Sequence, residues 1–118
     1  MTTHELNDQL NQMILRGEAL DAFEKFYADD VVMQENLDTP TVGKDANRSR
    51  EQEFFGSIET FHGAELLSAG ASEDVSFAEM AFDATYKGGH RNKLTEVAVR
   101  RWKDGKVVHE RFYYAPAG

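Results

Sequence analysis

The sequence contains no cysteine among its 118 residues and only two prolines. The absence of cysteine excludes a disulfide framework and thiol chemistry, and it fits a reducing compartment such as the cytoplasm. No apolar run approaches the roughly 20 residues that a membrane span needs. The N-terminus also lacks a basic flank followed by an apolar core. We therefore expect a cytoplasmic protein with no signal peptide and no membrane partner.

Positive charge is scarce as well. The 13 Lys and Arg residues are spread along the chain and are outnumbered by 21 Asp and Glu residues, which gives a formal net charge of −8. Because phosphate binding needs a concentrated basic surface, we expect no nucleic acid partner. The four histidines show no spacing typical of metal ligands, and no phosphate-binding or dinucleotide motif occurs. We expect neither a metal nor a cofactor.

Helical signals lie in the first half of the chain. Thr2 and Glu5 form a capping-box pattern, and apolar residues follow at helical spacing until Gly17, a natural end for a first helix. A second short helix is predicted around residues 20–27. A third, polar helix is predicted over residues 43–55, and we expect its charges to be solvated and paired locally.

Strand signals fill the rest of the chain. Residues 31–37, 58–72 and 75–86 are predicted strands, and Asp104-Gly105 between two runs rich in β-branched and aromatic residues predicts a hairpin over residues 94–114. Helices followed by a run of strands indicate one α+β domain spanning residues 1–118. Glycines inside the long strands favour curvature. We therefore predict a curved antiparallel sheet that forms a conical cavity with the three helices.

Two carboxyl groups fall in rows of otherwise apolar side chains. Strand alternation produces the rows Val31, Met33, Glu35, Leu37 and Val108, Glu110, Phe112, Tyr114. A carboxyl group in an apolar cavity has a raised pKa and can act as a base near neutral pH, so we predict catalytic roles for Glu35 and Glu110. Alternatively, Glu35 reaches solvent or caps the next turn, and Glu110 pairs with Arg100 on the adjacent strand. Glu96, two residues from Arg100 on the same face, is expected in a cross-strand ion-pair ladder.

Three short motifs are spread along the chain, so that their order and spacing together span nearly all of it. They are Phe26-Tyr27-Ala28-Asp29-Asp30-Val31-Val32, then Gly43-Lys44-Asp45-Ala46, and finally the segment from Arg101 to Tyr114. With these motifs the chain resembles the SnoaL-like, ketosteroid isomerase-like branch of the nuclear transport factor 2-like superfamily. The resemblance implies an α+β cone with an interior ligand pocket, commonly in a homodimer packed through its sheet.

The resemblance also suggests which residues to compare. In ketosteroid isomerase a general base lies at the end of the first strand, and counting from Ala28 places Glu35 there. The two oxyanion-hole donors of that enzyme match Leu10 and Ala98, neither of which can donate a hydrogen bond. The resemblance therefore implies a base at Glu35 and disfavours steroid isomerisation by that mechanism.

The expected function is the binding of an apolar small molecule with a polar end. Carboxylate acid/base catalysis would then make the protein a cofactor-independent isomerase, cyclase or dehydratase. The alternative, from another class, is a non-catalytic ligand-binding or dimerisation module. The residues expected to line the pocket are Tyr114, Phe112, Ala98, Arg100, Met33, Phe82 and Leu10. The outward row of the last strand is expected to contact a second subunit in a homodimer, and it consists of His109, Arg111 and Tyr113.

Overall fold

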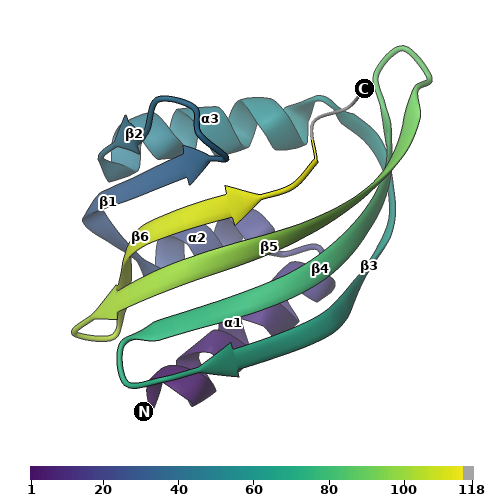
Figure 1. The fold of residues 1–118 in the computed structure, drawn as a ribbon. Helices are drawn as coiled ribbons and strands as arrows, with labels where there is room; N and C mark the ends of the chain where they lie inside the picture. The colour runs from purple at the N-terminus through teal and green to yellow at the C-terminus, as the bar shows by residue number, and fades with distance from the viewer. Residues whose placement is uncertain (116–118) are drawn as a thin grey trace.

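The computed structural model describes residues 1–115, so the last three residues of the predicted domain lie outside it. Three helices cover one face of a six-stranded sheet (Figure 1). The helices are α1 (Thr3–Leu15), α2 (Ala19–Phe26) and α3 (Lys44–Gly56). The strands are β1 (Tyr27–Glu35), β2 (Thr41–Val42), β3 (Ile58–Ala71), β4 (Val75–Tyr86), β5 (Arg91–Lys103) and β6 (Lys106–Tyr113). The predicted α+β fold class is confirmed.

The first helix begins at the predicted capping box. The Thr2 hydroxyl accepts a hydrogen bond from the Glu5 amide, and the Glu5 carboxylate accepts one from the Thr2 amide. These bonds satisfy amides that the start of a helix would otherwise leave free. α1 ends at Leu15, and Gly17 follows with a φ of 79°, a left-handed value that glycine adopts without strain. The chain then turns back, and α2 packs on α1.

The hydrophobic core lies between α1, α2 and one end of the sheet. Its buried members are Leu10, Ala22, Phe23, Phe26, Tyr27, Val31, Met33, Trp102 and Val107. The Trp102 ring is 6% exposed and meets the Phe26 ring edge-on, while the Phe23 and Tyr27 rings are stacked. These contacts hold α1 and α2 on the sheet.

A buried asparagine anchors α3. Asn47 Nδ2 lies within hydrogen-bond distance of the carbonyl oxygens of Val31, Thr41 and Gly43, at 3.3, 3.0 and 2.9 Å. One helical turn later Glu51 lies on the same side, and its side chain is only 19% exposed. The expectation that the charges of this helix are solvated is therefore wrong for Glu51. Its spacing of four residues from Asn47 places it on the face that meets the sheet.

The strands lie in the spatial order β2-β1-β6-β5-β4-β3. All neighbouring pairs are antiparallel except β1 and β6, which are parallel. The sheet is therefore mixed, and the prediction of a purely antiparallel sheet was wrong at this pair. Side-chain alternation is the same for both strand directions, so it could not indicate the direction. This pairing brings the end of β1, with Glu35, next to the strand that contains Glu110.

A bulge changes which residues of β6 face inward. Arg101 pairs with His109, whereas Trp102 pairs with Val107, so Val108 is an extra residue in β6. Val107 is therefore fully buried, and Val108, which alternation placed in the inward row, is only partly buried. After the bulge the inward row continues as predicted.

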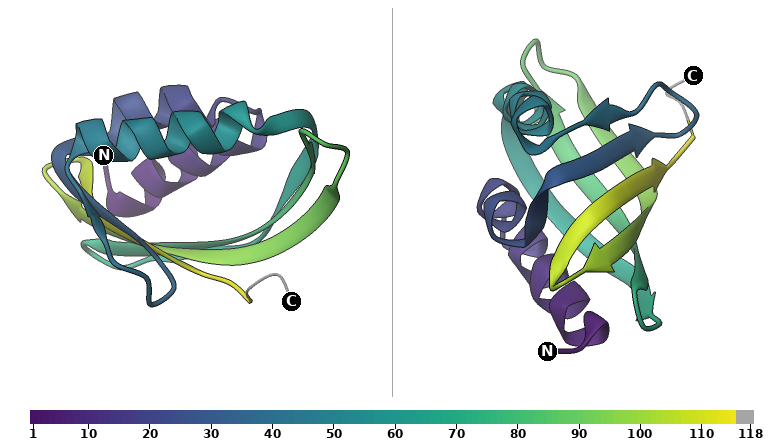
Figure 2. Two further views of the ribbon diagram at one scale, coloured as in Figure 1. Left: turned by 90° about the horizontal axis from the view of Figure 1, so that it is seen from above. Right: turned by 90° about the vertical axis from the view of Figure 1, so that its left-hand side faces the viewer.

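The sheet is strongly curved, and the helices lie across its concave side (Figure 2, left). The pairing of β3 with β4 contains three register shifts, one of them next to Gly63, in the strand whose glycines predicted bends. The concave face consists of the inward side chains of β1, β6, β5 and β4, and α3 packs over its β1 side. None of the helices among residues 1–115 is both long and apolar enough to span a bilayer.

Candidate functional site in the concave face

The strand register aligns inward side chains in rows across the concave face. The first row is Ser76, Arg100, Glu110 and Met33, and the second is Ala78, Ala98, Phe112 and Glu35. In the third row Glu96 is opposite Met80. Tyr114 directly follows the Val97–Tyr113 pair and continues the third row on the other side of Glu96. Ala98 of the second row therefore separates Arg100 of the first row from Glu96 of the third.

The first row contains a buried ion pair. Arg100 Nε donates to Glu110 Oε2 at 2.7 Å, and the Tyr27 hydroxyl donates to Glu110 Oε1 at 2.6 Å. Arg100 and Glu110 are each 1% exposed. Burial, and then the charge of Glu110, raise the pKa of Tyr27 well above its ordinary value, which keeps its hydroxyl a donor. The interpretation of Glu110 as the partner of Arg100 is confirmed, and these bonds offset the cost of burying its charge.

Arg100 also connects the sheet to α1. Its Nη1 donates to the Oδ1 atoms of Asn7 and Asn11 at 2.9 and 2.6 Å, and both asparagines are buried. Burial lowers the pKa of Arg100, but attraction to Glu110 and Tyr27 raises this pKa by more, so the guanidinium stays charged. The ion pair is therefore part of a network that holds α1 on the concave face.

Glu35 lies at the end of β1 with its side chain 30% exposed. Arg50 Nη2 of α3 is 3.5 Å from Glu35 Oε1, and the Tyr114 hydroxyl lies near the same carboxyl group. Burial raises the pKa of Glu35 by more than Arg50 and Tyr114 lower it. Leu37, predicted in the same row, lies beyond the end of β1 in a turn and is 87% exposed. The strand therefore ends with its only inward carboxyl group partly covered by α3.

Two further acids face the same space from α3 and β5. Burial raises the pKa of Glu51 to about 7, and repulsion from Glu110 adds to this effect. Burial and then repulsion from Glu110 raise the pKa of Glu96 to about 8. The nearest cation to Glu51 is Arg50, at 3.9 Å. Within residues 1–115 the Glu96 carboxyl group has no ion pair or hydrogen bond. Both acids are therefore partly protonated near neutral pH.

The sequence identified some of these groups and missed others. The structure brings Glu35 and Glu110 to one face, as expected, but pairs Arg100 with Glu110 and leaves Glu96 outside the predicted ion-pair ladder. The inward position of Glu51 follows from its spacing of four residues from Asn47, whose burial only the structure shows. Among residues 1–115, no three His, Asp or Glu side chains are placed to hold a metal ion.

The other residues predicted to bind ligand differ in burial. Leu10 and Met33 are 1% and 2% exposed and belong to the core. Ala98 is 4% exposed in the second row, and Phe82 and Phe112 are partly buried. Ligand contact with these residues stays a prediction.

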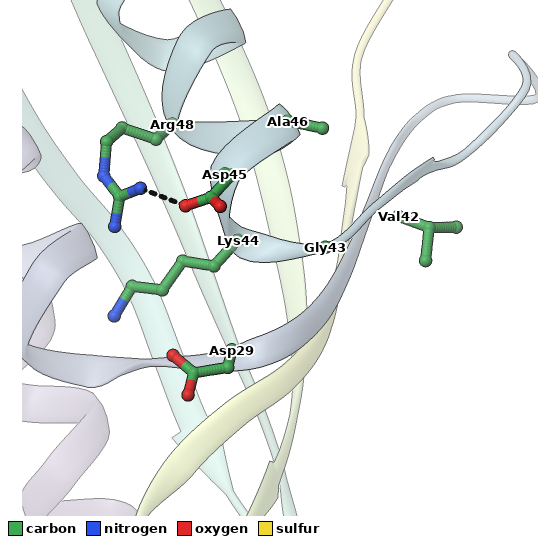
Figure 3. A pocket seen from close by; sticks show the side chains of 7 residues that line it. All are labelled: Asp29, Val42, Gly43, Lys44, Asp45, Ala46 and Arg48. Atoms are coloured by element: carbon green, nitrogen blue, oxygen red, sulfur yellow. Dashed lines mark hydrogen bonds and ion pairs between the residues drawn. The ribbon is translucent and has the colours of Figure 1, made fainter.

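Two surface hollows, of about 400 and 500 Å³, lie away from the four acids of the concave face. The first is at the start of α3, where Lys44 and Arg48 extend from the helix (Figure 3). Arg48 is bound by Glu24 at 2.6 and 2.8 Å, and Lys44 lies 3.9 Å from the same carboxylate. The second hollow is lined by Phe77, Val97 and neighbours on β3, β4 and β5. The predicted conical cavity therefore stays a prediction.

Comparisons with known proteins agree with the fold. No curated protein matches the chain. A solved structure from Mesorhizobium loti, provisionally named a SnoaL-like polyketide cyclase, is 30% identical with a TM-score of 0.86, covering 97% of this chain and 100% of the other. A provisionally named polyketide cyclase from Xanthomonas campestris is 22% identical with a TM-score of 0.77, covering 95% and 89% of the two chains.

A third solved structure shows the same fold with a bound small molecule. It is a protein from Catenulispora acidiphila with a ketosteroid isomerase-like fold, in complex with trimethylamine, and it is 14% identical with a TM-score of 0.77. The alignment covers 98% of this chain and 88% of the other. The model of the SnoaL-like domain family matches residues 1–114. The chain therefore belongs to the SnoaL-like domain family.

Proposed function

We propose that this protein binds an apolar small molecule with a polar end on its concave face and moves a proton on that molecule without a cofactor. The reaction class is that of an isomerase, cyclase or dehydratase. The observation that carries the proposal is Glu35, a carboxyl group on the inward face of β1 that is partly covered by α3, lies 3.5 Å from Arg50 Nη2 and has a raised pKa. A base of this kind is poised for proton abstraction closer to neutral pH than a solvated carboxylate.

The proposed step is enolisation of a carbonyl compound. Glu35 takes a proton from the carbon next to the carbonyl group, the C–H electrons form a C=C bond, and the carbonyl oxygen gains the negative charge. Once Glu35 has taken the proton and is neutral, Tyr114 turns its single hydroxyl proton to that oxygen and donates a hydrogen bond to it. Burial raises the pKa of the Tyr114 hydroxyl to about 12, so the group remains protonated.

Return of the proton from Glu35 to another carbon gives isomerisation. Attack of the enolate carbon on a second carbonyl group of the same molecule, whose oxygen takes the proton from Glu35, gives cyclisation. Departure of a β-hydroxyl group, which leaves as water with the proton from Glu35, gives dehydration.

We assign Glu110 an electrostatic role in this mechanism. Both of its carboxylate oxygens have partners, from Arg100 and Tyr27, so it is held in place. Its charge raises the pKa of Glu51 and Glu96, after the larger effect of burial. Glu110 therefore helps to keep protons on its neighbours instead of accepting one from the substrate.

The test is hydrogen–deuterium exchange at the carbon next to the carbonyl group of small ketones, followed by NMR in heavy water. The proposal predicts exchange faster than in buffer, lost in Glu35→Gln and retained in Glu65→Gln. Glu65 is exposed on β3, so its replacement removes the same charge at a distance from the concave face. Exchange at the buffer rate for acetophenone, cyclohexanone and a diketone would contradict a catalytic role.

A non-catalytic binding module is the second candidate. It is favoured by the Arg50–Glu35 contact of 3.5 Å, because a salt-bridged carboxylate is a weaker base. The fold accommodates a small molecule in at least one neighbour, the trimethylamine complex. The same exchange assay, combined with ligand binding detected by NMR, separates binding with turnover from binding alone.

We also propose a homodimer and a cytoplasmic location. The sheet face opposite the helices exposes aromatic side chains, with Phe77 and Tyr113 38% and 43% exposed. A second copy packed on this face would cover them and the outward row of β6. The cytoplasmic location rests on the absence of cysteine.

A further inference from the structure

Within residues 1–115, three buried side-chain atoms that could form a hydrogen bond have no partner: Asn11 Nδ2, Asn47 Oδ1 and Arg50 Nε. Both asparagines are 0% exposed, and each is held by its other amide atom, Asn11 by Arg100 and Asn47 by carbonyl oxygens. The Arg50 side chain, in contrast, is 32% exposed. An N–H donor without an acceptor is costly in a buried place. Of the three atoms, Arg50 Nε is therefore the one that belongs to a side chain within reach of a ligand.

The unpaired atom lies on the edge of the guanidinium group that other arginines of this chain use to bind carboxylates. Nε and Nη2 point along one edge, and together they form a fork that matches two oxygens. Arg48 donates from these atoms to Glu24 at 2.6 and 2.8 Å, and Arg91 donates from them to Asp83 at 3.0 and 2.8 Å. Among residues 1–115, the fork of Arg50 makes a single bond, from Nη2, at the long distance of 3.5 Å.

Arg50 lies beside the proposed base. Its Nη2 is 3.5 Å from Glu35 Oε1 and 3.9 Å from Glu51 Oε1. The side chains of Glu35 and Arg50 are 30% and 32% exposed, so a ligand can contact both from solvent. Because neither contact of Nη2 is short, the guanidinium group can turn without breaking a strong bond. Such a turn brings the covered Nε–H to the ligand.

The groups around Arg50 favour an uncharged ligand with an acceptor oxygen. A protonated amine offers only N–H donors, which cannot accept a hydrogen bond from Arg50. A carboxylate would match the fork but would be repelled by Glu35 and Glu51. A carbonyl oxygen accepts hydrogen bonds and brings no charge. One oxygen is enough for the fork, since Nε and Nη2 of Arg16 lie 3.2 and 3.0 Å from the same oxygen of Glu18.

We propose that Arg50 of α3 binds the carbonyl oxygen of the ligand through its Nε–Nη2 edge and stabilises the negative charge that forms there during enolisation. The inference rests on the function proposed above, in which Glu35 is the base. As Glu35 takes the proton, the C–H electrons form the C=C bond and the carbonyl π electrons move to the oxygen. The negative charge thus moves from Glu35 to the ligand, and Arg50 is a neighbour of Glu35 from the start.

Two consequences follow for the chemistry of the site. Proton transfer within the complex leaves the net charge unchanged, so Glu51 opposes it less than it would oppose the binding of an anion. Arg50 also supplies a second donor to the oxygen beside Tyr114. Two donors aimed at one developing charge form an oxyanion hole, and here they come from α3 and from the end of β6.

A binding experiment tests the fork without catalysis. The arginine Nε–H resonances of the nitrogen-15-labelled full chain are followed by NMR while cyclohexanone, cyclohexylamine or cyclohexanecarboxylate is added. The resonance of Arg50 is assigned by its absence in Arg50→Lys. We expect cyclohexanone to shift this resonance in a saturable way and to leave that of Arg48 unchanged, because Glu24 fills the Arg48 fork. Cyclohexanone should bind at least about tenfold more tightly than the other two probes.

The ketone exchange assay then tests the charge on the oxygen. Arg50→Gln should lower kcat about 100-fold, the loss typical of a removed oxyanion donor, with a smaller effect on KM. Arg50→Lys keeps the positive charge but loses the fork, so its rate should fall between those of Arg50→Gln and the wild type. Guanidinium ion at millimolar concentration should restore part of the activity of Arg50→Ala, a rescue that a merely structural role would not give.

Arg48→Gln is the matched control. Arg48 lies on the same helix, its side chain is also 32% exposed, and its fork is filled by Glu24. This variant should exchange ketone protons as fast as the wild type. Circular dichroism checks that all variants fold, and the NMR titration of the wild type needs no variant beyond the assignment.

Four results would overturn the role of Arg50. These are cyclohexanone binding that leaves the Arg50 resonance unchanged, tighter binding of the amine or the carboxylate than of the ketone, no saturable ketone binding at concentrations on the order of 10 mM, and wild-type exchange rates in Arg50→Gln or Arg50→Lys.

Failure of this inference is distinguishable from failure of the proposed function. If the wild type does not catalyse exchange, the catalytic role of Glu35 ends together with the charge on the ligand oxygen, and the NMR titration still decides whether Arg50 binds ketones. If the wild type catalyses exchange and Arg50→Gln is equally fast, Glu35 stands as the base with Tyr114 as its donor, and Arg50 has no part in the reaction.

Discussion

Replacing Glu96 with Gln should stabilise the protein at alkaline pH and leave its stability unchanged at acidic pH. Burial raises the pKa of Glu96 from 4.5 to about 8, so the native state holds this proton more tightly than the unfolded chain does. Between these two pKa values the unfolded chain loses the proton and the native state keeps it. The free energy of unfolding therefore falls as pH rises. Glutamine has nearly the same shape and is neutral throughout, so it removes this dependence.

The size of the effect follows from the same two values. A difference between 4.5 and about 8 corresponds to an upper limit of about 5 kcal/mol, at about 1.4 kcal/mol for each pKa unit. The neighbouring acids share part of this energy, because Glu110, Glu35 and Glu51 each repel the charge of Glu96. We expect a gain of about 2 to 5 kcal/mol at about pH 9 and less than about 0.5 kcal/mol at about pH 4.

The assay is urea unfolding at several pH values between about 4 and about 9, followed by circular dichroism and by the fluorescence of Trp102. Wild type, Glu96→Gln and the control Glu65→Gln are compared at each pH. The control should follow the wild type within about 0.5 kcal/mol, as an exposed surface change does. A Glu96→Gln variant that is no more stable than the wild type at about pH 9 would refute the reasoning.

Three further perturbations test the rest of the structure. Arg100→Met leaves Glu110 buried without its cation and should cost about 3 to 5 kcal/mol in urea unfolding, and an effect below about 1 kcal/mol would contradict the buried pair. Trp102→Ala removes a 6% exposed ring whose Nε1 donates to Ser76, so it should cost about 3 to 5 kcal/mol, and a loss below about 1 kcal/mol would contradict its burial. Light scattering of the wild type should give twice the chain mass of 13.3 kDa at micromolar concentration, and Phe77→Glu should give the single mass. A monomeric wild type would contradict the homodimer.

Local signals in the sequence predicted the elements well. The capping box at Thr2 and Glu5 marks the true start of α1, and the Asp104-Gly105 turn joins β5 to β6. The strand predicted over residues 75–86 agrees with β4, Val75–Tyr86. Each of these features depends on neighbours within a few residues, and such local preferences can be read directly from the chain.

Long-range features could not be read in the same way. The parallel pairing of β1 with β6 joins segments far apart in sequence, and alternation carries no strand direction. The bulge at Val108 arises because Trp102 pairs with Val107, a register that depends on both strands. The bonds from Arg100 to Asn7 and Asn11 connect residues that only the packing of α1 on the sheet brings together.

In the candidate site, too, the sequence predicted what depends on local alternation and missed what depends on long-range packing. Alternation correctly placed Glu35, Glu96 and Glu110 on inward rows. Alternation could not decide whether Glu96 or Glu110 would pair with Arg100. Both acids are on the same face of the sheet as Arg100, and the choice depends on the register of β5 and β6. Glu51 was missed because the surrounding charges of α3 made the whole helix look solvated. Asn47, one turn earlier, lies on the inward face, but its bond to the Val31 carbonyl oxygen depends on how α3 packs on β1.

The most direct test of the central claim is a carbon-13 NMR titration of the Glu35 carboxyl carbon, assigned by comparison with Glu35→Gln. A proton-accepting Glu35 on the concave face predicts a pKa above the ordinary value of 4.5, because burial outweighs the contributions of Arg50 and Tyr114. A measured pKa at or below about 4.3, the value of a solvated glutamate, would mean that water or Arg50 stabilises the charged form. That result would contradict the catalytic role of Glu35 and leave the binding module as the function of this fold.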